Sequence, residues 1–264
     1  MSQNLSQEQN LEEFFKQKKE QSGITTISGE RYMLVRSESI SFDFVSMVCE
    51  IYGEDRIGEA CKVAQGLIFD YAHALGISDA QFFRKKIPKL DNGGLLSSCF
   101  LHGMQMGLST ATIKGESVLS SDKSFFLQYS QHDSCESDPW VQSKKKAPSP
   151  VCFWSGAYYS GWCEEIFGVP LVAVELSCLA CGDKEDSCVI AHKDEIARLS
   201  KPLSSGRNID VPAFFGRKEL EEQLKKKSEE AALLNEFMLD REVKMTELKQ
   251  EIARLNTRLG IPIE

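Results

Sequence analysis

The C-terminal part of this 264-residue chain repeats its apolar residues with a period of seven. Two such series interleave at spacings of three and four residues, as the two core positions of a coiled coil do. Ten of the twelve positions are apolar, and the exceptions are Lys227 and Arg241. The positions are Leu220, Leu224, Lys227, Ala231, Leu234, Met238, Arg241, Met245, Leu248, Ile252, Leu255 and Leu259. The repeat predicts a coiled-coil helix over 218–260 and a parallel homodimer, and one amphipathic helix packed on its own domain is the alternative.

The rest of the chain divides by composition and periodicity. Residues 1–24 are polar with a small apolar cluster at helical spacing, which predicts a helical arm. Residues 25–200 mix helical and strand-type patterns and predict the main domain, and 201–217 has the composition of a linker. A hydrophobic fraction of 42% is ordinary for a domain that buries a core.

Helices and a small antiparallel sheet are predicted within the main domain. Helical spacing over 39–75 is interrupted at Gly53, which predicts two packed helices, and a third helix follows and ends near Lys89. Segment 29–36 predicts a short strand or the lead-in to a helix. Alternating apolar residues over 98–113 and 124–129 predict antiparallel strands, and the apolar run 170–176 predicts a buried strand. The expected fold class is therefore α+β, with helices packed on the sheet and a long C-terminal coiled-coil helix.

Charge and motif content exclude several classes of function. A formal net charge of -8 and a pI near 5.2 argue against a nucleic-acid-binding surface. There is no secretory leader pattern and no apolar run long enough to span a membrane, so we expect a cytoplasmic protein. No glycine-rich phosphate loop is present, which leaves nucleotide binding without support.

Nine cysteines, odd in number and irregularly spaced, indicate thiols or metal ligands rather than a disulfide framework. Cys152, Cys178, Cys181 and Cys188 make a possible four-thiolate zinc set. Glu175 competes for a place, because a lone carboxylate in a buried strand is unfavourable unless it is paired or binds a metal. Four filled ligand positions leave no room for an activated water. We therefore expect a structural zinc and no enzymatic activity.

Short motifs near the cysteines carry a further signal. They are the stretches 150–154, 156–161, 174–178 and 182–183 with Cys188, and upstream 29–34, 52–54 and 64–66. Together they resemble the 4-vinyl-reductase-type, zinc-containing sensory domain, the effector-binding module of xylene- and phenol-responsive transcriptional activators. The resemblance covers roughly 25–200. It implies a zinc site of Cys152, Glu175, Cys178 and Cys188, with Cys181 as the alternative to Glu175.

The same resemblance implies a mostly apolar pocket for a small hydrophobic or aromatic molecule. We expect it to be lined by Phe100, His102, Met104, Phe126, Tyr129, Tyr158, Tyr159 and Trp162. In phenol-sensing relatives a histidine and a tryptophan hold the hydroxyl group. His102 resembles the histidine, whereas Cys135 stands near the tryptophan position.

The function implied by the resemblance is ligand sensing that is relayed through a coiled-coil dimer. The regulators that the chain resembles carry an ATPase and a helix-turn-helix after the sensor, whereas this chain ends in its coiled coil. We therefore expect a stand-alone sensor, an adaptor or a fragment of a longer signalling protein, with a separate output protein as a candidate partner. One alternative is an accessory protein or reductase of tetrapyrrole metabolism. Another is a dimeric scaffold that binds no ligand.

Overall fold

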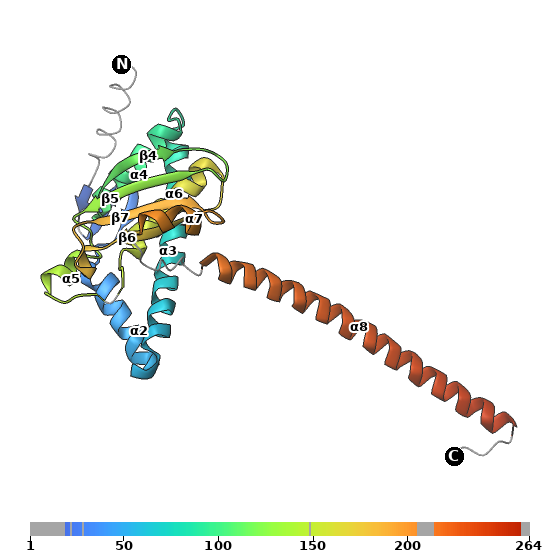
Figure 1. Ribbon diagram of the computed structural model, residues 1–264. Coiled ribbons are helices and arrows are strands. Elements are labelled where there is room, and N and C mark those ends of the chain that lie inside the picture. Colours follow the sequence, from blue (N-terminus) through green and yellow to red (C-terminus); the bar gives the residue numbers. More distant parts are fainter. Residues whose placement is uncertain (1–18, 22, 28, 148, 205–213, 260–264) are drawn as a thin grey trace. The chain divides into compact units, whose positions relative to one another are not determined.

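The structure is a computed structural model that describes residues 19–21, 23–27, 29–147, 149–204 and 214–259. It forms two compact units, Met1–Phe214 and Phe215–Glu264. The first unit is α+β, with helices against a small antiparallel sheet, which confirms the predicted class (Figure 1). Most of the predicted helical arm lies outside the described residues, and its described part contains strand β1 (Lys19–Gln21) rather than a helix.

Four strands form the central sheet of the first unit. They are β4 (Thr110–Val118), β5 (Phe126–His132), β6 (Leu171–Ser177) and β7 (Asp186–His192), and they pair antiparallel in the order β4-β5-β7-β6. The strands expected over 124–129 and 170–176 are thereby confirmed. All of β7 is buried, because it pairs along both edges and is covered by helices.

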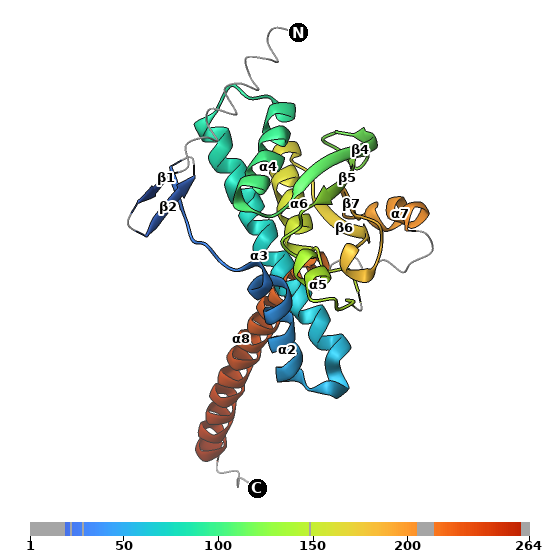
Figure 2. The same cartoon turned by 90° about the vertical axis from the view of Figure 1, so that its left-hand side faces the viewer.

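Three helices cover one face of this sheet, namely α3 (Ile57–Lys86), α4 (Asn92–Met106) and α6 (Phe153–Phe167), and the short α7 (Ile196–Ser200) lies on the other face (Figure 2). Helix α6 contacts α3, α4 and β6, and most of its residues are buried. Its backbone touches that of α3 at two glycines. A Cβ added at Gly76 would overlap the carbonyl oxygen of Tyr158, and one added at Gly161 would overlap that of His73.

Shorter elements precede and connect these helices. The π-helix η1 (Ser39–Asp43) leads into α2 (Phe44–Tyr52), which ends at Gly53 with φ of 78°. That glycine confirms the predicted break. Helix α3 then runs without interruption to Lys86, so the separate third helix expected after residue 75 is wrong. The remaining elements are η2 (Glu54–Arg56), α5 (Asp138–Gln142), η3 (Leu179–Cys181) and η4 (Lys201–Leu203).

The segment 98–106 is helical, which corrects the strand predicted to begin at residue 98. Asp91 caps the helix by accepting a hydrogen bond from the Gly94 N–H at 2.8 Å, and Gly107 ends it in the left-handed region. The buried residues Leu96, Cys99 and Gly103 follow a helical spacing rather than an alternation of two. His102 therefore projects from a helix, and the strand begins only at β4.

A second, three-stranded sheet lies near the N-terminus. Strands β1, β2 (Ile24–Ile27) and β3 (Glu30–Tyr32) pair antiparallel in sequence order, and β3 confirms a strand within 29–36. Figure 2 shows this small sheet apart from the four-stranded one. The three residues that follow it, Met33, Leu34 and Val35, are 81%, 79% and 50% exposed.

The described part of the second unit consists of one long helix, α8 (Phe214–Leu259), whose first residue is the last of the first unit, and it confirms the predicted C-terminal helix. Where the structure describes its side chains, the apolar heptad positions are exposed, including Leu234 at 61% and Leu248 at 53%. The coiled coil itself stays a prediction. The predicted linker contains η4, and much of its remainder falls on 205–213, outside the described residues. Among the helices in the described ranges, none has both the length and the apolar content that a membrane crossing requires.

Candidate functional site

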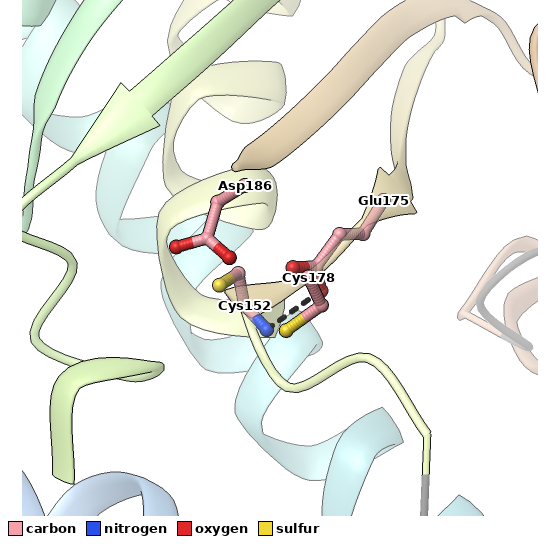
Figure 3. A group of neighbouring side chains, drawn as sticks. All are labelled: Cys152, Glu175, Cys178 and Asp186. Atoms are coloured by element: carbon pink, nitrogen blue, oxygen red, sulfur yellow. Dashed lines mark hydrogen bonds between the residues drawn. The ribbon is translucent and has the colours of Figure 1, made fainter. Parts of the chain in front are cut away.

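Two thiols and two carboxyl groups converge where α6 meets β6 and β7 (Figure 3). Cys152 immediately precedes α6, Glu175 lies in β6, Cys178 follows β6, and Asp186 begins β7. One ligand atom from each lies within 4.8 Å of the others. The structure therefore brings together three of the predicted zinc ligands, Cys152, Glu175 and Cys178, and adds Asp186.

Burial makes negative charge unfavourable in this group. Glu175 accepts a hydrogen bond from the Cys152 backbone N–H at 2.8 Å, while its Oε1 is shielded from solvent and has no hydrogen-bond partner among the described residues. Burial raises the pKa of Glu175 well above its ordinary value. Cys178 differs from Glu175, because a hydrogen bond with Cys152 lowers the pKa of its thiol to about 7. A bound cation would stabilise the anionic forms of all these groups.

Cys188 and Cys181 lie outside this group of four. Cys188 faces Glu175 across the β6–β7 pairing, and with Cys152 and Glu175 it lines a cavity of about 20 Å³. Cys181 packs against the apolar cluster that contains Cys152 and Cys178. Cys178 and Asp186 do not line this cavity, and the rest of its lining is apolar. Thiolate and carboxylate groups are donors that a zinc ion accepts. The cavity favours Cys188 over Cys181 as a further ligand.

Asp186 was not predicted, because no motif marks it and one of its hydrogen-bond partners, Ser137, lies 49 positions away in the chain. Its Oδ2 accepts a hydrogen bond from the Ser137 hydroxyl and its Oδ1 accepts one from the Leu179 N–H, both at 2.6 Å. Asp186 is fully buried, and burial raises its pKa. Because both oxygens already accept hydrogen bonds, Asp186 can orient the turn that carries Cys178 without itself binding a metal.

Glu136 is a further buried carboxyl group that was not predicted. It accepts hydrogen bonds from the backbone N–H groups of Trp154 and Ser155 at 2.7 and 2.9 Å, and from the Ser155 hydroxyl at 2.9 Å. The two N–H groups belong to the first turn of α6 and have no acceptor within the helix, and the helix dipole also favours a carboxylate there. Burial nevertheless raises the pKa of Glu136 to about 7. Glu136 thus fixes the start of the helix that follows Cys152.

A second set of polar side chains crosses the aromatic interior between α3, α4 and α6. The Tyr32 hydroxyl lies 2.6 Å from His102 Nε2, and His102 Nδ1 lies 2.7 Å from the Tyr158 hydroxyl. Tyr158 in turn donates to Asp79 Oδ2 at 3.0 Å. Four side chains from β3, α4, α6 and α3 therefore form one hydrogen-bonded chain.

The protonation states fix the direction of this chain at neutral pH. Burial raises the pKa of Asp79 to about 6, so its carboxylate is mostly ionised at pH 7 and can only accept. Tyr158 donates its proton there, and its oxygen accepts from His102 Nδ1–H. Burial lowers the pKa of His102 to about 4, so the ring is neutral and has one donor and one acceptor nitrogen. Nε2 is the acceptor, and Tyr32 donates to it.

Aromatic rings enclose this chain. Six of the eight predicted pocket residues contact one another there: Phe100, His102, Tyr129, Tyr158, Tyr159 and Trp162. Phe83, which was not predicted, adds a ring centroid 4.9 Å from that of His102. The structure does not bring in Met104, which is 47% exposed, or Phe126, which strand alternation places on the opposite face of β5 from the buried Tyr129.

Tyr32 and Asp79 were missed for the same reason. They lie 70 and 79 positions from their partners His102 and Tyr158, and no local pattern marks either residue. A groove of about 270 Å³ was missed as well. It shares no residue with the aromatic set and is lined by Ser39, Ile40, Phe44, Leu67, Ile68, Tyr71 and Trp154.

Comparison with known proteins gives a fold but no family. No protein-family model matches the chain, and no curated protein matches its sequence. The phenol-responsive sensory domain of the transcription activator PoxR, solved with phenol, is similar in structure, with a TM-score of 0.59 at 18% identity over 75% of this chain and 96% of that domain. Subunit 3 of a trafficking protein particle complex from Naegleria fowleri, covalently bound to palmitic acid, has a TM-score of 0.39 at 14% identity over 60% and 95% of the two chains, too remote to inform the site. The described first unit therefore has the fold of a known sensory domain.

Proposed function

We propose that the first unit senses a small hydroxylated aromatic molecule, with His102 Nε2 accepting the hydrogen bond from its hydroxyl group. The observation that carries this is the hydrogen-bonded chain from Asp79 through Tyr158 to His102, which makes Nε2, the nitrogen that the Tyr32 hydroxyl contacts, a hydrogen-bond acceptor among aromatic rings. A phenol combines a hydroxyl donor with a flat apolar ring and suits such a place. The fold shared with a phenol-responsive sensory domain supports the proposal.

A structural zinc ion is the second part of the proposal. Cys152, Glu175, Cys178 and Cys188 would hold it, and Asp186 would orient the turn beside them. The ion would be held by four protein ligands in a tetrahedral arrangement, with no open position for water. These residues would tie β6 and β7 to the start of α6, the helix that carries Tyr158. A zinc ion held in this way would have a structural role and not a catalytic one.

The long helix α8 suits the relay of ligand occupancy. We propose that it pairs with α8 of a second copy in a parallel coiled coil, and that the resulting dimer acts on a separate output protein. The exposed apolar heptad positions support this part of the proposal.

Phenol binding by the full-length protein tests the proposal. We expect phenol to raise the midpoint of thermal unfolding in a concentration-dependent way, and toluene, which has the ring but no hydroxyl group, to bind more weakly. His102→Phe keeps an aromatic ring and removes the acceptor, so it should weaken phenol binding by about 5- to 10-fold in calorimetry. Leu67→Ala in the separate groove is the matched control and should bind phenol as the wild type does.

Two results would contradict the proposal. Equal affinity for phenol and toluene would show that His102 Nε2 does not accept a hydrogen bond from the ligand. A loss of phenol binding in Leu67→Ala but not in His102→Phe would move the ligand to the groove. A coloured tetrapyrrole that purifies with the protein would instead favour the tetrapyrrole alternative.

A further inference from the structure

Tyr32 places a phenol of the chain itself on the proposed ligand-binding atom. Its hydroxyl lies 2.6 Å from His102 Nε2, and its ring meets the imidazole edge-on with centroids 5.8 Å apart and an interplanar angle of 70°. The side chain of tyrosine is 4-methylphenol attached to a backbone. The acceptor nitrogen that would receive an external phenol is therefore already bound by the same chemical group.

The described part of the chain that carries Tyr32 is mostly exposed to solvent. In the described part of the small sheet and the segment after it, Ile27 is buried and Tyr32 is half-buried, whereas Arg31, Met33 and Leu34 are exposed. The strands of this sheet pair with one another and not with the four-stranded sheet. The hydrogen bond from Tyr32 to His102 links this part of the chain to the helical core. Loss of that bond would remove a specific attachment and leave a small, mostly exposed element.

We propose that Tyr32 is a tethered competitor: an external hydroxylated aromatic molecule displaces it from His102, and the segment of residues 29–36 is released as a result. The inference rests on the proposed function, because it assumes that external phenols reach His102. It adds the regulation of that site, since ligand occupancy is converted into a change in a segment that leads directly into η1 and α2. No covalent change is involved.

Competition of this kind sets the affinity of the sensor. A tethered group has a high effective concentration, so His102 is free for an external ligand only part of the time. The apparent dissociation constant of that ligand equals its intrinsic value divided by the fraction of time that His102 is free of the tether. Tyr32→Phe keeps the ring and removes the donated hydrogen bond, which should tighten the binding of an external phenol by about 5-fold. Tyr32→Ala removes ring and hydroxyl together and should tighten it by roughly 10-fold or more.

The probe that separates these cases is 4-methylphenol, titrated by calorimetry into the full-length wild type, Tyr32→Phe and Tyr32→Ala. Met33→Ala, which changes the adjacent exposed residue, is the matched control and should bind as the wild type does. Hydrogen exchange of the wild type is the second measurement and needs no variant. Amides of residues 29–36 should exchange faster when 4-methylphenol is present, while those of α6 exchange more slowly.

The outcomes distinguish this inference from the proposed function. Affinity that increases from wild type through Tyr32→Phe to Tyr32→Ala, with faster exchange in 29–36, supports tethered competition. If 4-methylphenol binds the wild type in a manner that depends on His102, but neither Tyr32 variant binds more tightly and exchange in 29–36 is unchanged, the competition is refuted and the sensing function stands. If neither the wild type nor the Tyr32 variants bind 4-methylphenol, both proposals fail.

Discussion

At the scale of single residues, the acidic group around Glu175 makes the sharpest prediction. The Oε1 atom of Glu175 is shielded from solvent and lacks a hydrogen-bond partner among the described residues, so a bound zinc ion would supply the missing partner. We expect the purified wild type to hold about one zinc per chain and Glu175→Ala to lose it, because three ligands retain zinc poorly. Cys188→Ser should lose it too. Metal content by native mass spectrometry measures both.

Two conservative variants test the assignment of neighbouring groups. Cys181→Ser should keep its zinc, since Cys181, unlike Cys188, does not line the cavity that Cys152 and Glu175 share. Asp186→Asn should bind zinc about 10- to 100-fold more weakly, as expected for a residue that orients a ligand without binding the metal. Zinc that is lost in Cys181→Ser and retained in Glu175→Ala would reverse the assignment.

How far the site follows from sequence depends on how local its signals are. Cys152, Glu175 and Cys178 could be selected because ligand-type residues stood at characteristic spacings or in an apolar run. The direction of the hydrogen bonds at His102 could not be predicted from the sequence, because it depends on the ionised state of Asp79, which lies in another helix. Tyr32 carries no signal of its own and acquires meaning only when the fold places it on that histidine.

At the scale of elements, the crossing of α3 and α6 depends on two glycines whose partners are backbone atoms. Gly76→Ala and Gly161→Ala should each lower the free energy of unfolding by about 1 to 3 kcal/mol, because a methyl group cannot fit without moving the helices apart. Urea unfolding followed by tryptophan fluorescence reports this, since Trp140, Trp154 and Trp162 all lie in the first unit.

Gly66→Ala is the control within the same helix α3. An added Cβ there meets no atom within 4 Å, and alanine favours helix over glycine, so stability should rise by up to about 1 kcal/mol. Equal effects at Gly66 and Gly76 would mean that the two helix backbones are not in contact.

Element types were predictable where periodicity was unambiguous and boundaries were marked. The glycine that ends α2 and the apolar run that becomes β6 are examples. The segment 98–106 failed because apolar residues at alternate positions mimic a strand, while the deciding signals are the cap at Asp91 and the left-handed Gly107. The close approach at Gly76 was also invisible, since it depends on which helix lies opposite.

At the scale of the whole molecule, the division into two units suggests that sensing and assembly are separable. Every residue of the proposed ligand site lies in the first unit, whereas the heptad repeat lies in the second. Substitutions at His102 should therefore alter phenol binding without altering oligomeric state. The repeat was predictable from sequence because seven-residue periodicity is a local property, and its partner helix was not.

The seam of the predicted coiled coil is the last testable feature. Leu248 occupies a core position of the repeat, and Leu248→Glu would place two carboxylates opposite each other in a parallel pair. We expect the dissociation constant of the dimer to rise at least roughly 100-fold, because the change removes apolar burial and adds like-charge repulsion. Sedimentation velocity of the full-length protein at micromolar concentration measures it.

The control lies two residues away on the opposite face of the same helix. Gln250→Glu adds the same charge outside the seam and should stay dimeric. Arg241→Leu removes a charge from the core and should tighten the dimer. A wild type that sediments as a monomer, or a Leu248→Glu variant that stays as dimeric as Gln250→Glu, would show that α8 does not pair through this seam, and the relay would then need another path.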